Sequence, residues 1–187
     1  MLTVITGSMF SGKTSRLISL CTSHVIAKDR VIVFKPVIDN RYDIDFIVSH
    51  NLCKFTCVTA DIVPVQARNI LKNNAYDVVC FDEVQFFAPN IIVDFIEELN
   101  YSGAYKRIIC AGLPQDSDGN PFGAMPELLC MADEIIQLKA VCSLCHAVDG
   151  ATKTFRINKN NGSQILVGGA ADYSAMCKSC WIKSRGV

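Results

Sequence analysis

One short segment constrains the fold more than any other part of this sequence. Residues 7–14, GSMFSGKT, fit the pattern G-x-x-x-x-G-K-[ST] of a loop that wraps around phosphate groups. The apolar run LTVIT at 2–6 predicts a buried strand before the loop, and helical spacing of apolar residues predicts a helix from Lys13 to about residue 27. A strand, such a loop and a helix in this order predict a phosphate-binding site at the end of a parallel β-sheet.

Strands and helices alternate along the chain as far as residue 138. Short apolar runs bounded by turn residues predict strands at 30–35, 53–59, 76–83, 106–113 and 134–138. Helical periodicity predicts helices at 64–73, 89–100 and 122–131, and the polar stretch 36–50 predicts a solvated loop. This alternation predicts an α/β fold, similar to P-loop NTPases, in which helices cover both faces of a mostly parallel sheet.

The pattern changes after Leu138. Cysteine pairs, the turn NKNNG at 158–162 and the loop GGAADY at 168–173 replace the alternation. The runs ATKTFRI at 151–157 and QILVGG at 164–169 predict a hairpin around that turn. We therefore expect two units. Residues 1–140 would form a P-loop domain that binds ATP, and residues 141–187 would form a small C-terminal domain.

Composition excludes several classes of protein. Half of the 187 residues are hydrophobic, which argues against disorder and allows a sizeable core. Eighteen basic residues balance eighteen acidic ones, so no overall positive field would recruit nucleic acid or a membrane surface. The apolar runs are too short to span a membrane, and no secretory leader is recognisable. We expect a soluble, cytoplasmic protein with no nucleic-acid or membrane partner.

The phosphate loop requires a metal partner, and the sequence supplies one. Lys13 would neutralise charge on the β- and γ-phosphates, Thr14 would bind Mg²⁺, and Asp82 at the end of an apolar strand could hold the metal ion through water. A switch, a motor and a kinase would share this arrangement. The predicted site for ATP and Mg²⁺ comprises Asp82 and the loop residues Gly7, Ser8, Met9, Phe10, Ser11, Gly12, Lys13 and Thr14.

Glu83 is the candidate catalytic residue. The metal ion needs one carboxylate from this strand, so the adjacent Glu83 can accept the proton of an attacking hydroxyl or position a hydrolytic water. Phe86 and Phe87 follow closely, and aromatic rings beside a phosphoryl-transfer centre suit a flat organic acceptor. Packing in the core would explain the two rings equally well.

Ten cysteines are many for a protein in a reducing compartment. Four of them form two C-x-x-C pairs, Cys142 with Cys145 and Cys177 with Cys180. Two such pairs that meet form the usual structural zinc site, which would close the base of the intervening loop. Because His146 follows Cys145, the first pair also fits the haem-attachment motif C-x-x-C-H, and redox or core thiols are a third interpretation. The other six cysteines lie in apolar surroundings and are expected in the core.

Two other classes of protein share parts of this pattern. A P-loop GTPase would normally carry an N-K-x-D motif for guanine, but the nearest string, NKNN at 158–161, lacks the aspartate. A zinc-ribbon module for nucleic acid would share the cysteine pairs, and KSCWIKSR at 178–185 is locally basic. The balanced overall charge argues against that module.

Taken together, the motifs resemble those of type II thymidine kinases over nearly the whole chain. The segments GSMFSGKT, FDEVQFF, GLPQDSDGNPFGA, AVCSLC, VGGAADY and CKSC occur in the order and at the spacing of that family. The resemblance implies transfer of phosphate from ATP to the 5′-hydroxyl of thymidine, or of deoxyuridine, in pyrimidine salvage. It also implies a homotetramer.

The resemblance assigns roles to individual residues. Glu83 matches the general base of the family's D-E-x-Q-F-F motif, and Arg41 matches an arginine that contacts phosphate. Gln85 is also placed with the ATP and Mg²⁺ site. Residues from about 164 to 173 match a lasso loop, whose backbone binds the pyrimidine edge and whose base is held together by zinc. The implied nucleoside-binding residues are Met9, Phe86, Leu113, Ser117, Thr152, Gln164, Leu166, Gly168 and Tyr173.

Two residues depart from the family's pattern. Pro114 stands where the family often has aspartate, and Ser117 stands where it usually has a phenylalanine that stacks on the base. A missing base–aromatic stack removes about 1–3 kcal/mol of binding energy unless another residue supplies it. What replaces this stack, and how strongly thymidine is preferred over deoxyuridine, has no side-chain signature in the sequence.

Overall fold

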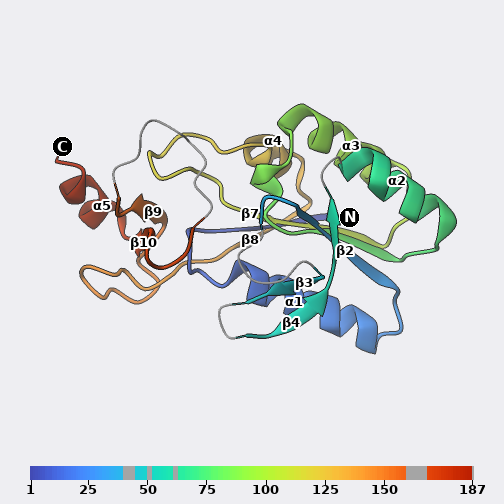
Figure 1. Cartoon of the computed structure of the whole chain (residues 1–187), viewed down its shortest axis with the longest axis horizontal. Coiled ribbons are helices and arrows are strands. Elements are labelled where there is room, and N and C mark those ends of the chain that lie inside the picture. Colours follow the sequence, from blue (N-terminus) through green and yellow to red (C-terminus); the bar gives the residue numbers. More distant parts are fainter. Residues whose placement is uncertain (40–44, 50–51, 61–62, 159–167, 187) are drawn as a thin grey trace.

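The computed structural model describes residues 1–39, 45–49, 52–60, 63–158 and 168–186 (Figure 1). The chain forms a large α/β body that carries the N-terminus and a smaller C-terminal part that contains two strands and one helix. Arg41, Gln164 and Leu166, three of the predicted binding residues, lie outside the described ranges.

A parallel β-sheet forms the centre of the large body. In the described part of the chain this sheet has six strands in the order β5-β2-β6-β7-β1-β8, and every pairing in it is parallel. The inner strands are continuous apolar runs because helices bury both faces of the sheet. The strands are β1 (Leu2–Thr6), β2 (Val31–Pro36), β5 (Val58–Ala60), β6 (Val78–Phe81), β7 (Arg107–Gly112) and β8 (Glu134–Gln137).

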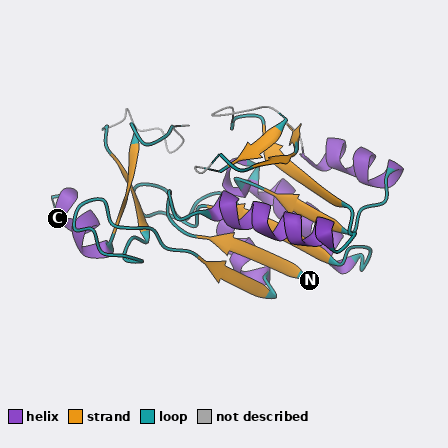
Figure 2. Cartoon of the chain, turned by 90° about the horizontal axis from the view of Figure 1, so that it is seen from below, coloured by secondary structure: helices purple, strands orange, loops and turns teal. Residues whose placement is uncertain are grey.

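Helices cover both faces of this sheet, as Figures 1 and 2 show. On one face lies α1 (Lys13–Ile26), and on the other lie α2 (Val63–Asn73), α3 (Pro89–Tyr101) and α4 (Met125–Met131). Helix α3 begins at a proline and buries Ile92, Phe95, Ile96 and Leu99, which recur at helical spacing. The predicted α/β fold is therefore confirmed. No helix in the described ranges is both long enough and apolar enough to cross a membrane.

The structure corrects the prediction in the segment before α2. The single strand expected at 53–59 is two strands, because β4 (Lys54–Thr56) ends before Cys57 and β5 then joins the edge of the sheet beside β2. β4 instead pairs antiparallel with β3 (Phe46–Val48), which lies in the stretch expected to be a loop. Ile47 explains the extra strand, since it is buried against the α1 side of the core.

The small C-terminal part is built on an antiparallel strand pair. β9 (Lys153–Arg156) pairs with β10 (Tyr173–Met176), and the short helix α5 (Lys178–Ser184) follows directly. The predicted hairpin would pair β9 with the run at 164–169, but residues 164–167 lie outside the described ranges, so that pairing stays a prediction. The observed register places Met176 opposite Lys153, which brings the chain entering Cys177 close to the chain leaving Cys145.

Candidate functional site

The carboxyl ends of β1, β6 and β7 lie at one edge of the sheet and open into a cavity of about 250 Å³. This is where ligands bind in open parallel sheets, because the loops that follow the strands converge there. Many of the predicted site residues line the cavity, namely Met9, Phe10, Ser11, Gly12, Lys13, Thr14, Asp82, Glu83, Phe86, Leu113, Ser117, Gly168 and Tyr173.

The phosphate loop connects β1 to α1, as the motif requires. Gly12 at the start of the helix has φ +87°, a backbone conformation that favours glycine. The Lys13 amine is buried and donates to the Ser8 carbonyl at 2.9 Å, so it lies folded against the loop. Ser11 Oγ is buried and has no hydrogen-bond partner among the described residues. A phosphate oxygen would supply the partner that this hydroxyl lacks.

Thr14 and Asp82 form the candidate Mg²⁺ site. The Thr14 hydroxyl donates to Asp82 Oδ2 at 3.2 Å, so two hard oxygen ligands meet at the base of the loop. Burial of Asp82, reinforced by the nearby charges of Glu83 and Asp39, raises the pKa of its carboxyl group to about 7. A cation at this point would favour the ionised carboxylate, so the residues present fit Mg²⁺.

Glu83 has a strained backbone that its neighbours hold in place. Its φ of 48° and ψ of 43° lie in the left-handed region, which is uncommon for a residue other than glycine. The 3₁₀ turn η1 (Val84–Phe86) follows at once and returns Gln85 into the interior. Gln85 Nε2 donates to Glu83 Oε2 at 2.6 Å, while Gln85 Oε1 accepts the Leu113 N–H at 3.0 Å.

Gln85 is buried and is not among the residues that line the cavity. A Cβ atom on Gly112 would lie 2.7 Å from its amide oxygen, so glycine is required for this close approach. The sequence places Gln85 with the ATP and Mg²⁺ site, and in the structure its amide is directed at Glu83 and at the Leu113 N–H, just after β7. Gln85 therefore contacts the candidate base directly.

An apolar cluster forms another part of the cavity wall. Met9, Leu113, Phe122 and Tyr173 pack together, and the Phe86 ring meets Phe122 edge to face at 5.6 Å between centroids. These side chains come from four separate segments of the sequence. Their flat, apolar surface suits an aromatic ring or a base.

Three further predicted residues lie away from the cavity wall. Gly7 and Ser8 precede the part of the loop that lines it, and the Ser8 hydroxyl donates to the Ala151 carbonyl. Thr152 lies one residue before β9 and is not on the wall either. Thr154, two residues further on, lines the cavity instead. It is buried beside the phosphate loop, and its Oγ1 accepts the Met9 N–H at 3.0 Å.

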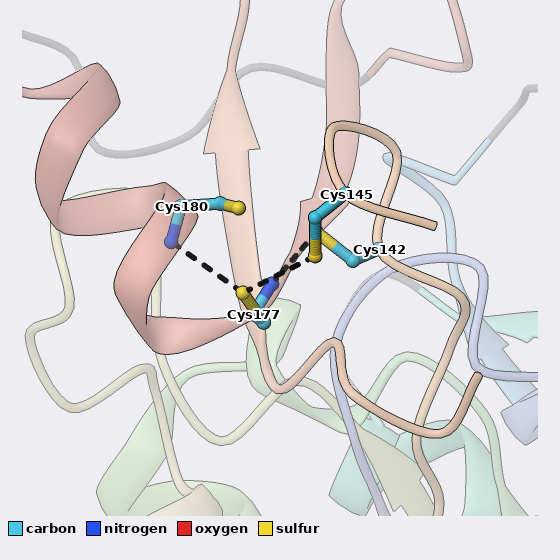
Figure 3. Close-up of side chains that lie close together, drawn as sticks. All are labelled: Cys142, Cys145, Cys177 and Cys180. Carbon is cyan, nitrogen blue, oxygen red and sulfur yellow. Dashed lines mark hydrogen bonds between the residues drawn. The ribbon is translucent and has the colours of Figure 1, made fainter. Parts of the chain in front are cut away.

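The four paired cysteines meet in the C-terminal part (Figure 3). The sulfur atoms of Cys142, Cys145, Cys177 and Cys180 all lie within 4.8 Å of one another. Hydrogen bonds from the backbone N–H groups of Cys145 and Cys177 lower the pKa of the Cys142 thiol to about 6, which favours the thiolate. Four converging sulfur ligands fit a tetrahedral zinc ion and leave no open position for chemistry. The haem interpretation, by contrast, leaves the second pair without a role.

A family comparison gives the arrangement its context. The family model described as thymidine kinase matches residues 1–181. The chain belongs to the thymidine kinase family. This match spans the phosphate loop, the Glu83 segment and all four clustered cysteines.

Thymidine kinases from three organisms are similar to the chain over almost its full length. The thymidine kinase of Bacteroides thetaiotaomicron is 40% identical over 98% of this chain and 87% of its own. That of Coprothermobacter proteolyticus is 43% identical over 94% of this chain and 87% of its own. That of Thermococcus kodakarensis is 39% identical over 95% of this chain and 91% of its own.

Among solved structures, the flagellar accessory protein FlaH from Methanocaldococcus jannaschii is 16% identical to the chain and covers 73% of it, with a TM-score of 0.44. A crystal structure titled as a DNA replication initiation factor gives a TM-score of 0.43 at the same 16% identity. Neither likeness bears on what this thymidine kinase family member does.

Sequence reasoning did not assign several residues of the cavity wall. Lys35 lies at the carboxyl end of β2 and Asp39 follows that strand, so their position near Asp82 could have been inferred from the parallel sheet. Phe46 reaches the wall from β3, a strand that the sequence did not predict. Phe122 lies within the PFGA segment already recognised as a family motif, which was a usable signal.

Proposed function

We propose that the protein is an ATP-dependent thymidine kinase that gives dTMP and ADP, and that it also accepts deoxyuridine. One observation carries the proposal: a single cavity is lined by the phosphate loop, by Glu83 and by an apolar cluster that suits a base. A nucleotide hydrolase would need only the first two of these. An apolar acceptor site beside the candidate base favours an organic alcohol over water as the nucleophile.

ATP binds with its β- and γ-phosphates in the phosphate loop. Backbone N–H groups and the start of α1 provide donors, and Lys13 moves from the Ser8 carbonyl to the phosphates. Ser11 Oγ supplies a further hydrogen bond. Thr14 and Asp82 would hold Mg²⁺, which neutralises charge on the transferring phosphate group.

Glu83 acts as the general base. The 5′-hydroxyl oxygen forms a bond to the γ-phosphorus as the bond from phosphorus to the β–γ bridging oxygen breaks, and ADP leaves. The hydroxyl proton passes to the Glu83 carboxylate. Gln85 Nε2 donates to Oε2 and so fixes the orientation of the carboxylate that takes this proton.

The acceptor nucleoside occupies the part of the cavity bounded by the apolar cluster. Met9, Leu113 and Tyr173 contact the base and sugar, and Gly168 lines the same cavity. Arg156 Nη2 donates to the Tyr173 hydroxyl at 3.0 Å, which fixes that ring. The roles of Gln164 and Leu166 in binding the pyrimidine edge, and of Arg41 in binding phosphate, belong to this proposal on the family resemblance alone.

The C-terminal cysteine cluster holds a structural zinc ion in this proposal. The ion joins the chain entering β9 to the chain leaving β10, and so fixes the base of the lasso segment. A homotetramer, a cytoplasmic location and the absence of a nucleic-acid partner also belong to the proposal.

A coupled assay of ADP release against a panel of nucleosides tests the function. Thymidine and deoxyuridine should each stimulate ADP release well above the rate with ATP alone, and purine nucleosides and ribonucleosides should not. Equal ADP release with and without any nucleoside would identify a nucleotide hydrolase instead. A filter-binding assay at physiological salt excludes a nucleic-acid-binding module if no complex forms.

A further inference from the structure

Trp181, the single tryptophan of the chain, joins two segments that are far apart in the sequence. It lies on α5, and its indole N–H points between two backbone carbonyl groups. Nε1 is 3.3 Å from the Ser117 oxygen and 3.2 Å from the Thr154 oxygen, so both carbonyls share one donor. A three-centre hydrogen bond of this kind ties the loop after β7 to strand β9.

Ser117 and Thr154, the two residues whose carbonyls accept the indole N–H, both line the cavity. Ser117 lies in the tight loop 115–121, which is closed by a bridge between Gln115 and Pro121. Thr154 reaches the phosphate loop through the hydrogen bond from the Met9 N–H. The indole of Trp181 therefore connects two walls of one cavity from behind, without lining the cavity itself.

The loop 115–121 is ordered internally by Asp116. One carboxylate oxygen of Asp116 accepts the N–H groups of Asp118 and Asn120, at 2.9 Å each. These bonds fix the shape of the loop but not its place relative to β9. Contacts with the C-terminal part set this position, and they include the hydrogen bonds from Lys153 to Gln115 and from Trp181 to Ser117.

The surroundings of the indole ring match this role. A Cβ atom on Gly119 would lie 3.1 Å from the ring, so the loop backbone packs directly on it. The Arg185 guanidinium lies over the ring, 4.4 Å from its centroid. Arg185 Nη1 also donates to the Ser117 carbonyl at 3.4 Å and to Asp118 at 3.2 Å. Trp181 on α5 and Arg185 just after that helix thus both contact the loop 115–121.

We propose that Trp181 is a positioning residue for the acceptor nucleoside. It holds the loop that contains Ser117 at a fixed distance from Thr154 on β9, on the other side of the cavity. This inference rests on the proposed function. Ser117 has too small a side chain to form a stack with the base, so the position of its loop sets the width of the pocket. Releasing the indole hydrogen bond lets the loop move away and weakens nucleoside binding, while the phosphate loop keeps its own hydrogen bonds.

The test is Trp181→Phe, which keeps an aromatic ring and removes the N–H donor. The KM for thymidine should rise about 3- to 10-fold, the effect expected of one lost hydrogen bond. The kcat and the KM for ATP should stay within about twofold of wild type, a split that general destabilisation would not produce. Lys183→Gln, an exposed position on the same helix, is the matched control and should change none of these values.

Hydrogen exchange gives a second readout that does not depend on turnover. Peptides that contain residues 115–121 should exchange faster in Trp181→Phe than in wild type, whereas peptides from α1 should be unchanged. If Trp181→Phe does not fold, Arg185→Met replaces it, because this change removes the other donor to the Ser117 carbonyl. It should raise the KM for thymidine about twofold, and an unchanged value would count against the proposal.

The outcomes separate this inference from the proposed function. A folded Trp181→Phe enzyme with unchanged thymidine KM, or with an equal rise in the KM for ATP, would overturn the role of Trp181 and leave the kinase assignment intact. If the wild type fails to phosphorylate any nucleoside, the proposed function is wrong. Hydrogen exchange would then still decide whether Trp181 holds the loop.

Discussion

The Gln85 side chain is fixed at both ends, and its Nε2 atom donates to Glu83 Oε2 at 2.6 Å. The direction of the amide is determined, because the Leu113 N–H can donate only to the oxygen of Gln85. The nitrogen must therefore face Glu83. The left-handed backbone of Glu83 and the buried amide of Gln85 together hold the Glu83 carboxylate in one orientation beside the phosphate loop.

Replacing Gln85 by methionine should lower kcat and leave ATP binding intact. Methionine fills a similar volume but cannot donate to the carboxylate. A hydrogen bond to a charged group is worth about 1.5–3 kcal/mol, or a factor of about 10 to 160 in kcat. Steady-state kinetics with ATP as the varied substrate measures both quantities. A direct role for Gln85 in binding ATP would instead appear as a large rise in the KM for ATP.

Replacing Cys177 by serine should remove zinc and weaken thymidine binding more than ATP binding. The lasso segment would lose the link at its base, whereas the phosphate loop lies in the other part of the molecule. Metal analysis of the purified protein and separate KM values for the two substrates check this. Cys130→Ser is the control, since Cys130 is exposed on α4 and lies outside the cluster. Wild-type protein without zinc would refute this account of the cluster.

Replacing Ser117 by phenylalanine should tighten thymidine binding. Ser117 lines the cavity, and a ring at this position can stack on the base with a gain of about 1–3 kcal/mol. Calorimetric titration with thymidine in the absence of ATP measures the change directly. Weaker binding would show that the side chain at this position does not face the base.

Acid should destabilise the protein in part by neutralising the carboxylates of an ion-pair network. This network lies at the amino ends of β2, β6 and β7, opposite the site. The pKa of Asp29 is lowered by hydrogen bonds from Lys106 and His24, and that of Asp77 is lowered by hydrogen bonds from Arg30 and Lys106. Both folded-state pKa values lie below the ordinary value of 3.8, so their contribution is complete at neutral pH and is lost as pH falls through that region.

The test of this network compares Asp29→Asn with wild type across pH. The variant should be less stable at pH 7, and the difference in urea midpoint should shrink as the pH approaches about 3. Asp94→Asn, an exposed position on α3, is the control and should track wild type. A difference that stays constant with pH would contradict the linkage.

Much of the fold was predictable because its strands are continuous apolar runs between turn residues. VVCF at 78–81 and the run that forms β7 carry that signal directly. β3 was missed because its three residues lie within a polar stretch, and only Ile47 is fully buried. Local pattern was too weak there, and tertiary contact with α1 decided the structure.

The site was predictable where a motif fixes the backbone and less so where side-chain direction decides. The phosphate loop and the cysteine pairs are defined by spacing, so their geometry follows from the sequence. The inward turn of Gln85 depends on the left-handed backbone of Glu83, which spacing does not reveal. Thr152 and Thr154 are two residues apart, and only the packing of β9 against the phosphate loop selects Thr154.

The central claim is that Glu83 removes the proton from an alcohol held beside the phosphate loop. Replacing Glu83 by glutamine keeps the shape of the side chain and removes the base, and it leaves the Thr14–Asp82 pair in place. The most direct measurement is single-turnover phosphorylation of thymidine by this variant, with ATP binding followed in parallel. We predict a rate lowered about 10²- to 10⁴-fold with ATP affinity within about twofold of wild type. Turnover close to the wild-type rate would contradict the account.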